Sequence, residues 1–518
     1  MNPPAESERS RDRRGWLVWA APGLLTLVVT VTGIGHAQPW RDELATWSAA
    51  TRPVPDLVRL AGTIDAATGP YYLLMHGWTA LFGTSPTALR LPSALAMAGA
   101  AALTARLGAR LAGPRAGLLA GLLLTVLPVT SRYGQEARPY ALATLLAVLA
   151  TLLLVGALGR PTWRRCTGYA VAVAALGLLH LIALTLLAAH ALVVLLVAAR
   201  GRAAAGLDPP AGPAPPAEEA HAVTGGAAPC AGHPAGARGP DVVWRWLVAL
   251  LPAAVLVAPL VLAAGRQRGR QLDWVRLVRV DDLAALPGAL AQSGVVGGLL
   301  VGLAALGAGR LGRRALLPGA AVLLPVLLLF AAGTAVPLWV TRYLVFTVPF
   351  ACLLAGAALA GVRLAPALAV VTLAGLLGLP DQAALRRTHE WPRTAPVDYA
   401  GVARIVADHE QPGDAVVYSP RDSWLFPDLG LAYHLGARRP RDVLVVRDQR
   451  QRADLWAAEC DRPAECLAGV DRVWLVVTGR RADPLAAVPG AKGDALRDAF
   501  TVRQVWPRPG LTVALLTR

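Results

Sequence analysis

The sequence carries little charge for its length. Asp, Glu, Lys and Arg make up 16% of the 518 residues, whereas apolar residue types make up 55%. A water-soluble enzyme of this size needs a more strongly charged surface, so we exclude that class. Apolar runs of about 20 residues, the length that crosses a bilayer, recur between residues 16 and 380. The sequence therefore predicts a polytopic membrane protein.

Several motifs of soluble binding proteins are missing. The five cysteines have no C-x-x-C or other metal-ligand spacing. The C-terminal region has no G-x-G-x-x-G loop or P-loop, so it offers no nucleotide site. The formal charge of +17 comes almost wholly from arginines in short loops between apolar runs, which excludes a continuous basic face for nucleic acid. Cys460 and Cys466 are equally compatible with a disulfide and with two free thiols.

About eleven spans are expected. The first, residues 16–34, follows an arginine cluster and is too long for the apolar core of a signal peptide, so the tail 1–15 should be cytoplasmic. Spans then fill an N-terminal membrane half, 16–200, and a C-terminal membrane half, 243–380. Between them, residues 201–242 are rich in Ala, Pro and Gly and predict a flexible cytoplasmic linker.

Two external loops and an external domain follow from this topology. The first loop, 36–68, is polar and offers short interfacial helices at 44–51 and 56–61, followed by a re-entrant or interfacial helix at 69–82. The second loop is 265–285. An odd number of spans also places residues 381–518 outside, where helical patterns alternate with short apolar runs and indicate a small α/β domain. The expected strands are 415–418, 443–446, 473–477 and 511–516.

Two adjacent carboxylates, Asp42 and Glu43, follow the first span and lie between Trp40 and Trp47. One interpretation is an acidic start to an interfacial helix in a solvated loop. The other is a catalytic carboxylate held at the membrane surface.

Arginines lie on the outer side of the membrane, where the positive-inside tendency disfavours them. Arg132 and Arg138 flank a polar turn, and Arg342 begins a later span. Five more interrupt the second loop around Trp274: Arg266, Arg268, Arg270, Arg276 and Arg279. Solvated loops and lipid headgroup contacts are the ordinary alternatives. Guanidinium groups also match phosphate bidentately, so a lipid phosphate is a natural ligand.

These features fit one reaction. When a sugar is transferred from a polyprenyl phosphate, the phosphate leaves without needing a proton. The reaction needs one carboxylate to deprotonate the acceptor hydroxyl and cations to stabilise the developing phosphate charge.

The sequence also resembles a known group, the C-superfold membrane glycosyltransferases of the protein O-mannosyltransferase and aminoarabinose transferase type, especially actinobacterial mannosyltransferase-like members. The motifs that carry the resemblance are Trp40-Arg41-Asp42-Glu43, residues 69–78 (GPYYLLMHGW), residues 89–93 (LRLPS) and residues 132–140 (RYGQEARPY). It covers about the first 200 residues, extends weakly to Arg342-Tyr343, and says little about the C-terminal domain.

The resemblance implies a fold, a donor and a set of site residues. It implies a polyprenyl-phosphate sugar donor, Asp42 as catalytic base and Glu43 as a supporting or acceptor-binding residue. The implied donor-phosphate contacts are Arg132, Arg138, Tyr140 and Arg342. Further candidates for donor or acceptor binding are Asp65, Tyr71, Tyr72, His76, Gln135, Glu136, Arg270 and Trp274. No metal ligands are expected, although the chemistry is compatible with a divalent cation.

The predicted function is inverting transfer of a sugar, with mannose the first candidate, to an envelope glycan, lipid or protein acceptor at the outer face of the plasma membrane. A lipid-phosphate transporter or flippase is an alternative that would use the same arginines. A non-catalytic envelope scaffold is another. Transporters commonly carry ionisable residues near mid-span or inverted repeats, and the sequence has no clear example of either.

Overall fold

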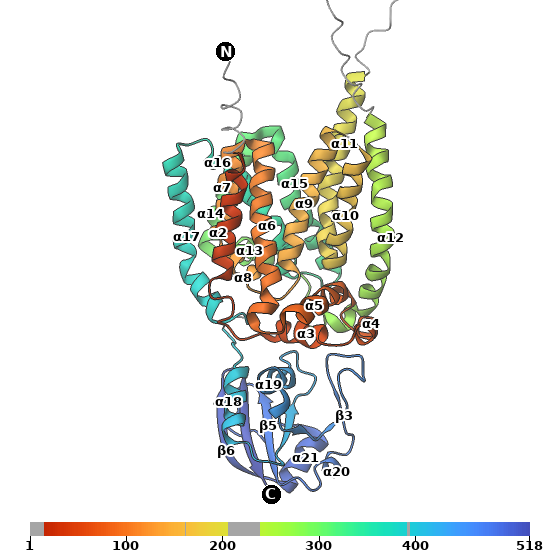
Figure 1. Cartoon of the computed structure of the whole chain (residues 1–518), viewed down its shortest axis with the longest axis vertical. Coiled ribbons are helices and arrows are strands. Elements are labelled where there is room, and N and C mark those ends of the chain that lie inside the picture. The colour runs from red at the N-terminus through yellow and green to blue at the C-terminus, as the bar shows by residue number, and fades with distance from the viewer. Residues whose placement is uncertain (1–14, 161, 206–238, 391–393) are drawn as a thin grey trace, which may run out of the picture.

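The computed structural model describes residues 15–160, 162–205, 239–390 and 394–518 and consists of a helical bundle with an α/β domain at one end (Figure 1). The predicted cytoplasmic tail, apart from Gly15, and most of the predicted linker lie outside the described residues. The two ends of the predicted linker are helical, because α11 (Leu186–Ala205) continues to residue 205 and α12 (Gly239–Gln271) begins at residue 239.

The bundle is built from long apolar helices. Seven stretches of the described chain are long and apolar enough to cross a membrane, or eight if the bent pair Pro114–Val126 and Pro128–Gly134 counts as one span. The protein is therefore a multi-pass membrane protein. Its bundle helices are α2 (Leu17–Val31), α6 (Pro86–Ala112), α7 (Pro114–Val126), α8 (Pro128–Gly134), α9 (Tyr140–Gly159), α10 (Trp163–Leu179), α11, α12, α14 (Gly294–Leu311), α15 (Leu316–Ala335), α16 (Val348–Leu359) and α17 (Leu364–Arg387).

This count of seven or eight is lower than the predicted eleven for physical reasons. Helix α2 has 15 residues and α10 has 17, which is short for a span of about 20 residues. Helices α14 and α15 lie in a single apolar stretch interrupted by the 3-10 turn η3 (Gly312–Ala315). The span predicted from residue 286 begins later, because α13 (Val280–Ala291) is a separate helix that ends at Gln292.

Three short helices lie across the end of the bundle that faces the α/β domain (Figure 1). They are α3 (Arg41–Ala50), α4 (Val54–Thr63) and α5 (Gly69–Phe82), with the turn η1 (Ala66–Thr68) before α5. Glu43 fixes the start of α3, because its carboxylate accepts a hydrogen bond from the Trp40 backbone N–H at 3.3 Å. All three predicted helices of this segment therefore form, and α5 has the predicted bounds.

The α/β domain contains a five-stranded sheet in the order β2-β1-β5-β7-β6. Strand β1 (Ala415–Ser419) pairs in parallel with β2 (Arg441–Asp442) and with β5 (Arg472–Thr478). Strand β7 (Leu511–Thr517) pairs antiparallel with both of its neighbours, β5 and β6 (Thr501–Arg508). Both faces of the sheet are buried. Val416 and Tyr418 pack towards α18 (Tyr399–His409) and α19 (Pro427–Leu435), and Ala415 and Val417 pack towards α21 (Gly490–Ala499).

Two strand predictions need correction. The expected strand 443–446 is split, because Leu444 turns into the core between β2 and β3 (Val445–Arg447), and β3 pairs instead with β4 (Ala458–Glu459). Strand β6 was not expected, because it is an edge strand whose residues are mostly exposed and do not alternate between apolar and polar types. Cys460 and Cys466 form a disulfide beside α20 (Pro463–Cys466).

The α/β domain and the end of the bundle share one hydrophobic core. Leu44 and Tyr71 belong to the same cluster of buried side chains as Tyr399, Phe426 and Trp456. Polar contacts join the same two parts: Arg52 donates to the Asp454 carbonyl at 2.8 Å, and Arg270 pairs with the Asp454 carboxylate at 2.7 Å. The domain therefore forms part of the wall around the space that faces α3.

Candidate active site

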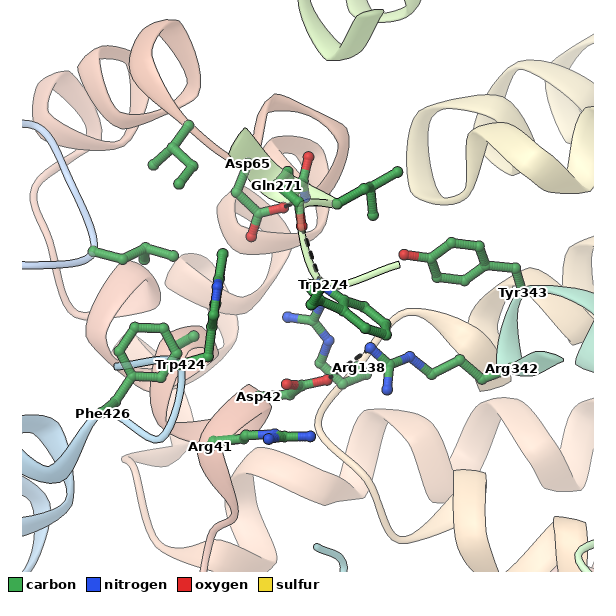
Figure 2. Close-up of a pocket in the computed structure, with 14 residues that line it drawn as sticks. Arg41, Asp42, Asp65, Arg138, Gln271, Trp274, Arg342, Tyr343, Trp424 and Phe426 are labelled. Carbon is green, nitrogen blue, oxygen red and sulfur yellow. Dashed lines mark hydrogen bonds and ion pairs between the residues drawn. The ribbon is translucent and has the colours of Figure 1, made fainter. Parts of the chain in front are cut away.

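A cavity of about 270 Å³ lies where α3, the end of α12 and the α/β domain meet. Figure 2 shows Asp42 at its centre, with Arg138 and Arg342 close by. The described residues that line it are Arg41, Asp42, Ala45, Ile64, Asp65, Arg138, Gln271, Leu272, Trp274, Arg342, Tyr343, Trp424, Phe426 and Leu455. Asp42 and Arg342, separated by 300 residues in the sequence, thus contribute to one site.

Asp42 is an ionised carboxylate with an available oxygen. Its Oδ2 lies 3.6 Å from Nη2 of Arg342 and accepts no hydrogen bond from any described residue. Burial opposes ionisation, but the guanidinium groups of Arg342 and Arg138 outweigh it and hold the pKa of Asp42 below its ordinary value. A carboxylate of this kind can accept a proton from a hydroxyl that enters the cavity.

Glu43 is adjacent in sequence but has a different environment. Its side chain is only 1% exposed, and its oxygens accept hydrogen bonds from Arg90 at 2.8 and 2.6 Å and from the Ala137 N–H at 2.9 Å. Burial raises its pKa, but the Arg90 ion pair outweighs this and holds the pKa of Glu43 well below its ordinary value. The Glu43 carboxylate therefore joins α3 to α6 and to the segment that carries Arg138.

Replacing Arg90 with methionine should destabilise the protein by about 3–5 kcal/mol, because it leaves the Glu43 carboxylate buried without its partner. Thermal unfolding in detergent measures this as a lower melting temperature. Arg59→Met is the matched control, since Arg59 is 57% exposed in its pair with Asp56 and should change little. Equal melting temperatures for the two variants would contradict a structural role for the buried pair.

Three arginines around Asp42 have buried N–H groups without a hydrogen-bond partner among the described residues. These groups are Nη1 of Arg132, Nε of Arg138 and Nε of Arg342. Buried guanidinium donors are rarely left unpaired in a folded protein, so unpaired donors indicate a missing acceptor. Three cationic groups with free donors match the oxygens of a phosphate.

A second cavity of about 290 Å³ adjoins the first, and the two share Arg342 and Trp274. The Arg342 guanidinium lies over the Trp274 ring at 5.4 Å. Arg132 and Arg276 also line this second cavity, and α13 contributes Asp282 and Gln292 from its two ends. Beyond α13, an apolar groove of about 430 Å³ runs between α13, α14, α15 and α16. The second cavity and the apolar groove are therefore both bordered by α13 or the residue that follows it.

Asp65 approaches the first cavity from the turn before η1. It has a left-handed backbone conformation, with φ of 59°, and is 6% exposed. Its carboxylate accepts hydrogen bonds from Thr68 at 2.6 Å and from the Tyr72 hydroxyl and the Gln271 amide. Burial raises the pKa of Asp65. The Tyr72 hydroxyl in turn accepts a hydrogen bond from Arg138 at 3.4 Å, which connects Asp65 to the arginines.

The structure brings part of the predicted site together. Asp42, Asp65, Arg138, Trp274 and Arg342 line the first cavity. Arg132 lines the second cavity. Within the described residues, the lining of both cavities leaves out Glu43, Tyr71, Tyr72, His76, Gln135, Glu136, Tyr140 and Arg270.

The residues outside the lining are held by packing or by other polar contacts. His76 Nδ1 bonds to the Ala50 carbonyl oxygen at 2.9 Å, and Gln135 donates to backbone oxygens of Thr30 and Thr32. Tyr71 is fully buried. The Tyr140 ring packs against the Tyr343 ring at 6.5 Å and therefore supports a lining residue.

Nine residues that line the first cavity were not among the sequence candidates: Arg41, Ala45, Ile64, Gln271, Leu272, Tyr343, Trp424, Phe426 and Leu455. The last three belong to the α/β domain and are more than 370 residues from Asp42 in the sequence. Arg41 and Gln271 did carry a signal, since Arg41 adjoins the acidic pair and Gln271 lies in the arginine-rich second loop.

Among the described residues, the acidic side chains do not gather into a metal site. In the described ranges, no group of three or more His, Cys, Asp and Glu side chains lies close enough to hold a metal ion. The Asp42 carboxylate is paired with arginine instead.

Comparison with known proteins shows which fold this arrangement of helices and strands resembles. Residues 69–205 match the family model described as dolichyl-phosphate-mannose-protein mannosyltransferase. The chain is also similar to ArnT from Cupriavidus metallidurans in the apo state, with a TM-score of 0.57 and 14% identity over 97% of this chain and 98% of that chain. The protein has the fold of the C-superfold glycosyltransferases.

The chain is equally similar to the structure of ArnT from Cupriavidus metallidurans bound to undecaprenyl phosphate, with a TM-score of 0.57 and 14% identity over 97% of this chain and 98% of that chain. A search of the curated proteins gave no match. The alignment with ArnT covers nearly the whole chain, so the likeness of fold extends to the α/β domain as well as the bundle.

Proposed function

We propose that the protein is an inverting membrane glycosyltransferase that moves a sugar from a polyprenyl phosphate to an acceptor hydroxyl on the outer side of the plasma membrane. The observation that carries the proposal is the set of three arginines with unpaired buried donors around a carboxylate whose Oδ2 is available. The match of residues 69–205 to a family named for dolichyl-phosphate mannose supports the donor class and makes mannose the first sugar to test.

The donor phosphate would lie against Arg132, Arg138 and Arg342. Its polyprenyl chain would enter the apolar groove between α13 and α16, which lies beyond the helix that borders the phosphate site. This arrangement leaves the sugar in the first cavity, next to Asp42. The arrangement favours transfer over transport of a lipid phosphate, because a carboxylate with a free oxygen faces the position of the reacting sugar.

The reaction would be a single displacement. The acceptor oxygen attacks the anomeric carbon while the bond from that carbon to the phosphate oxygen breaks, and the configuration inverts. The acceptor proton passes to Oδ2 of Asp42. The bonding electrons leave with the phosphate, where the arginines stabilise the added negative charge.

A transfer assay tests the proposal. The full-length protein in proteoliposomes is given radiolabelled polyprenyl-phosphate mannose, then the corresponding arabinose and galactose donors, with an envelope extract as acceptor. We expect label in the extract and free polyprenyl phosphate in equal amounts, and an altered envelope glycan profile in a deletion strain. A normal profile together with no transfer from any donor would contradict the proposal, and lipid movement without transfer would favour a flippase.

Donor affinity should depend on Glu136. This residue is 1% exposed, lies 3.5 Å from Arg132, and has a pKa raised to about 7 by burial. Below that pH it is neutral and no longer offsets the charge of Arg132, so the donor KM should fall as the pH drops through about 7. In Glu136→Gln the donor KM should be low at every pH. A wild-type donor KM that does not change between about pH 6 and 8 would contradict this role.

A further inference from the structure

One wall of the cavity comes from the α/β domain. Trp424, Phe426 and Leu455 line the space that contains Asp42. In Figure 2, Asp42 lies between this wall and the side formed by Arg342 and Tyr343. Since the donor phosphate is assigned to the arginine side, the wall of the α/β domain borders the part of the cavity left for the acceptor.

The aromatic wall is rigid. The Trp424 ring meets the Trp456 ring edge to face at 4.7 Å, and the Phe426 ring stacks on Trp456 at 5.4 Å. Trp456 is itself fixed, because its indole N–H donates to the Ser423 carbonyl at 3.1 Å and the Arg270 guanidinium lies over its ring. Such a cluster presents the half-buried Trp424 in one orientation.

Phe426 has a strained backbone. Its φ is 49°, in the left-handed region that a residue with a bulky side chain seldom adopts. Its side chain is only 2% exposed. A strained residue persists where the surrounding structure holds it, and such residues concentrate at binding sites. With this backbone conformation, the Phe426 ring forms a second aromatic part of the cavity wall, beside Trp424.

Polar groups that can hold hydroxyls also line the cavity. Asp65 and Gln271 line it and are bonded to each other. The Asp65 carboxylate is fixed by Thr68 and Tyr72 as well, so it offers its remaining lone pairs in a set direction. An apolar aromatic face next to a fixed carboxylate and an amide suits a ligand with C–H groups on one face and hydroxyls at its edge.

We propose that the acceptor is a carbohydrate, whose ring lies on Trp424 and whose hydroxyls bond to Asp65 and Gln271 while the reacting hydroxyl reaches Asp42. This proposal rests on the proposed function and adds the acceptor class to it. A peptide acceptor fits less well, because an extended peptide is commonly held by the edge of a sheet. Among the described residues that line the cavity, none belongs to a strand.

Acceptor kinetics of Trp424 variants test the proposal. The label of the transfer assay is followed into polysaccharide and protein fractions of the envelope, separated by protease digestion. With wild-type protein, label should enter protease-resistant carbohydrate. Trp424→Ala should raise the acceptor KM about 10-fold or more and leave the donor KM unchanged, because it removes the stacking face and no donor contact. Trp424→Phe should restore most of the affinity.

Trp506→Ala is the matched control, since Trp506 is a half-buried tryptophan of the same domain that packs on Trp474 at 5.7 Å. It should leave both KM values unchanged. Label in the protease-sensitive fraction, or an unchanged acceptor KM in Trp424→Ala, would overturn the carbohydrate assignment and leave the glycosyltransferase proposal standing.

Binding is measured separately from transfer. The full-length protein is titrated with oligosaccharides released from the envelope while its tryptophan fluorescence is recorded. A change that Trp424→Phe reduces and Trp506→Ala retains supports the proposal. A titration with no Trp424-dependent change would overturn it, even if no donor supports transfer.

Discussion

Replacing Asp42 with asparagine should lower kcat for sugar transfer by about 10²- to 10⁴-fold, the usual contribution of a general base. Asparagine keeps the shape of the side chain but cannot take the acceptor proton. The Asp42 carboxylate lies among arginines with free donors, and its Oδ2 accepts no hydrogen bond from the described chain. Transfer from a polyprenyl-phosphate sugar, measured at saturating donor, checks this expectation.

Donor binding separates a catalytic from a structural role for Asp42. Asp42→Asn should still bind the polyprenyl phosphate, because removing a negative charge beside Arg342 does not weaken the attraction for an anion. Asp281→Asn is the control, as an exposed aspartate of α13. Near-normal transfer by Asp42→Asn would refute the base assignment, and lost donor binding together with a lower melting temperature would indicate a structural role.

Replacing Arg342 with glutamine should lower kcat/KM for the donor by about 10²- to 10³-fold, the cost of removing one group that stabilises transition-state charge. Arg342 borders both cavities, so it is placed to contact the phosphate before and after the bond to the sugar breaks. Its guanidinium is held over Trp274 and next to Asp42. Steady-state kinetics with varied donor concentration measure the effect.

The same substitution should shift the pH dependence of transfer. Arg342 lowers the pKa of Asp42, so Arg342→Gln should raise this pKa towards its ordinary value. The base works only when ionised, and the acid limb of the rate profile should therefore move to higher pH. Arg59→Gln is the matched control, because Arg59 is 57% exposed, already pairs with Asp56 at 2.6 Å and lines neither cavity. Equal losses in both variants would show that general positive charge, rather than Arg342, supports catalysis.

Side-chain placement explains why only part of the site was predictable. Asp42 and Glu43 are adjacent acidic residues, so the residue pattern alone does not show which of them faces a cavity. In the structure, Glu43 is closed off by Arg90, whereas Asp42 faces the cavity. The helical turn that separates neighbouring residues by about 100° decides between the two roles, and this depends on which face of α3 packs against α6.

The arginines show the same limit of what the sequence alone can predict about the site. Arg132, Arg138 and Arg342 could be grouped in advance, because the predicted topology places the segments that carry them on one side of the membrane. Arg270 and Arg276 both come from the predicted second loop, 265–285. Each pairs with a carboxylate in the structure, Arg270 with Asp454 and Arg276 with Asp282. Which cation remains available for a ligand depends on carboxylates elsewhere in the chain.

The sequence by itself determined the membrane class, the three surface helices, most strands of the α/β domain and the grouping of Asp42 with Arg138 and Arg342. These features follow from composition, apolar periodicity and charge placement, which act over one element at a time. Only the tertiary structure decided that Trp424 and Phe426 line the same cavity as Asp42, that the Glu43 carboxylate is closed off by Arg90, and that an apolar groove lies along α13. Contacts between residues hundreds of positions apart depend on how whole elements pack, and no local pattern records that packing.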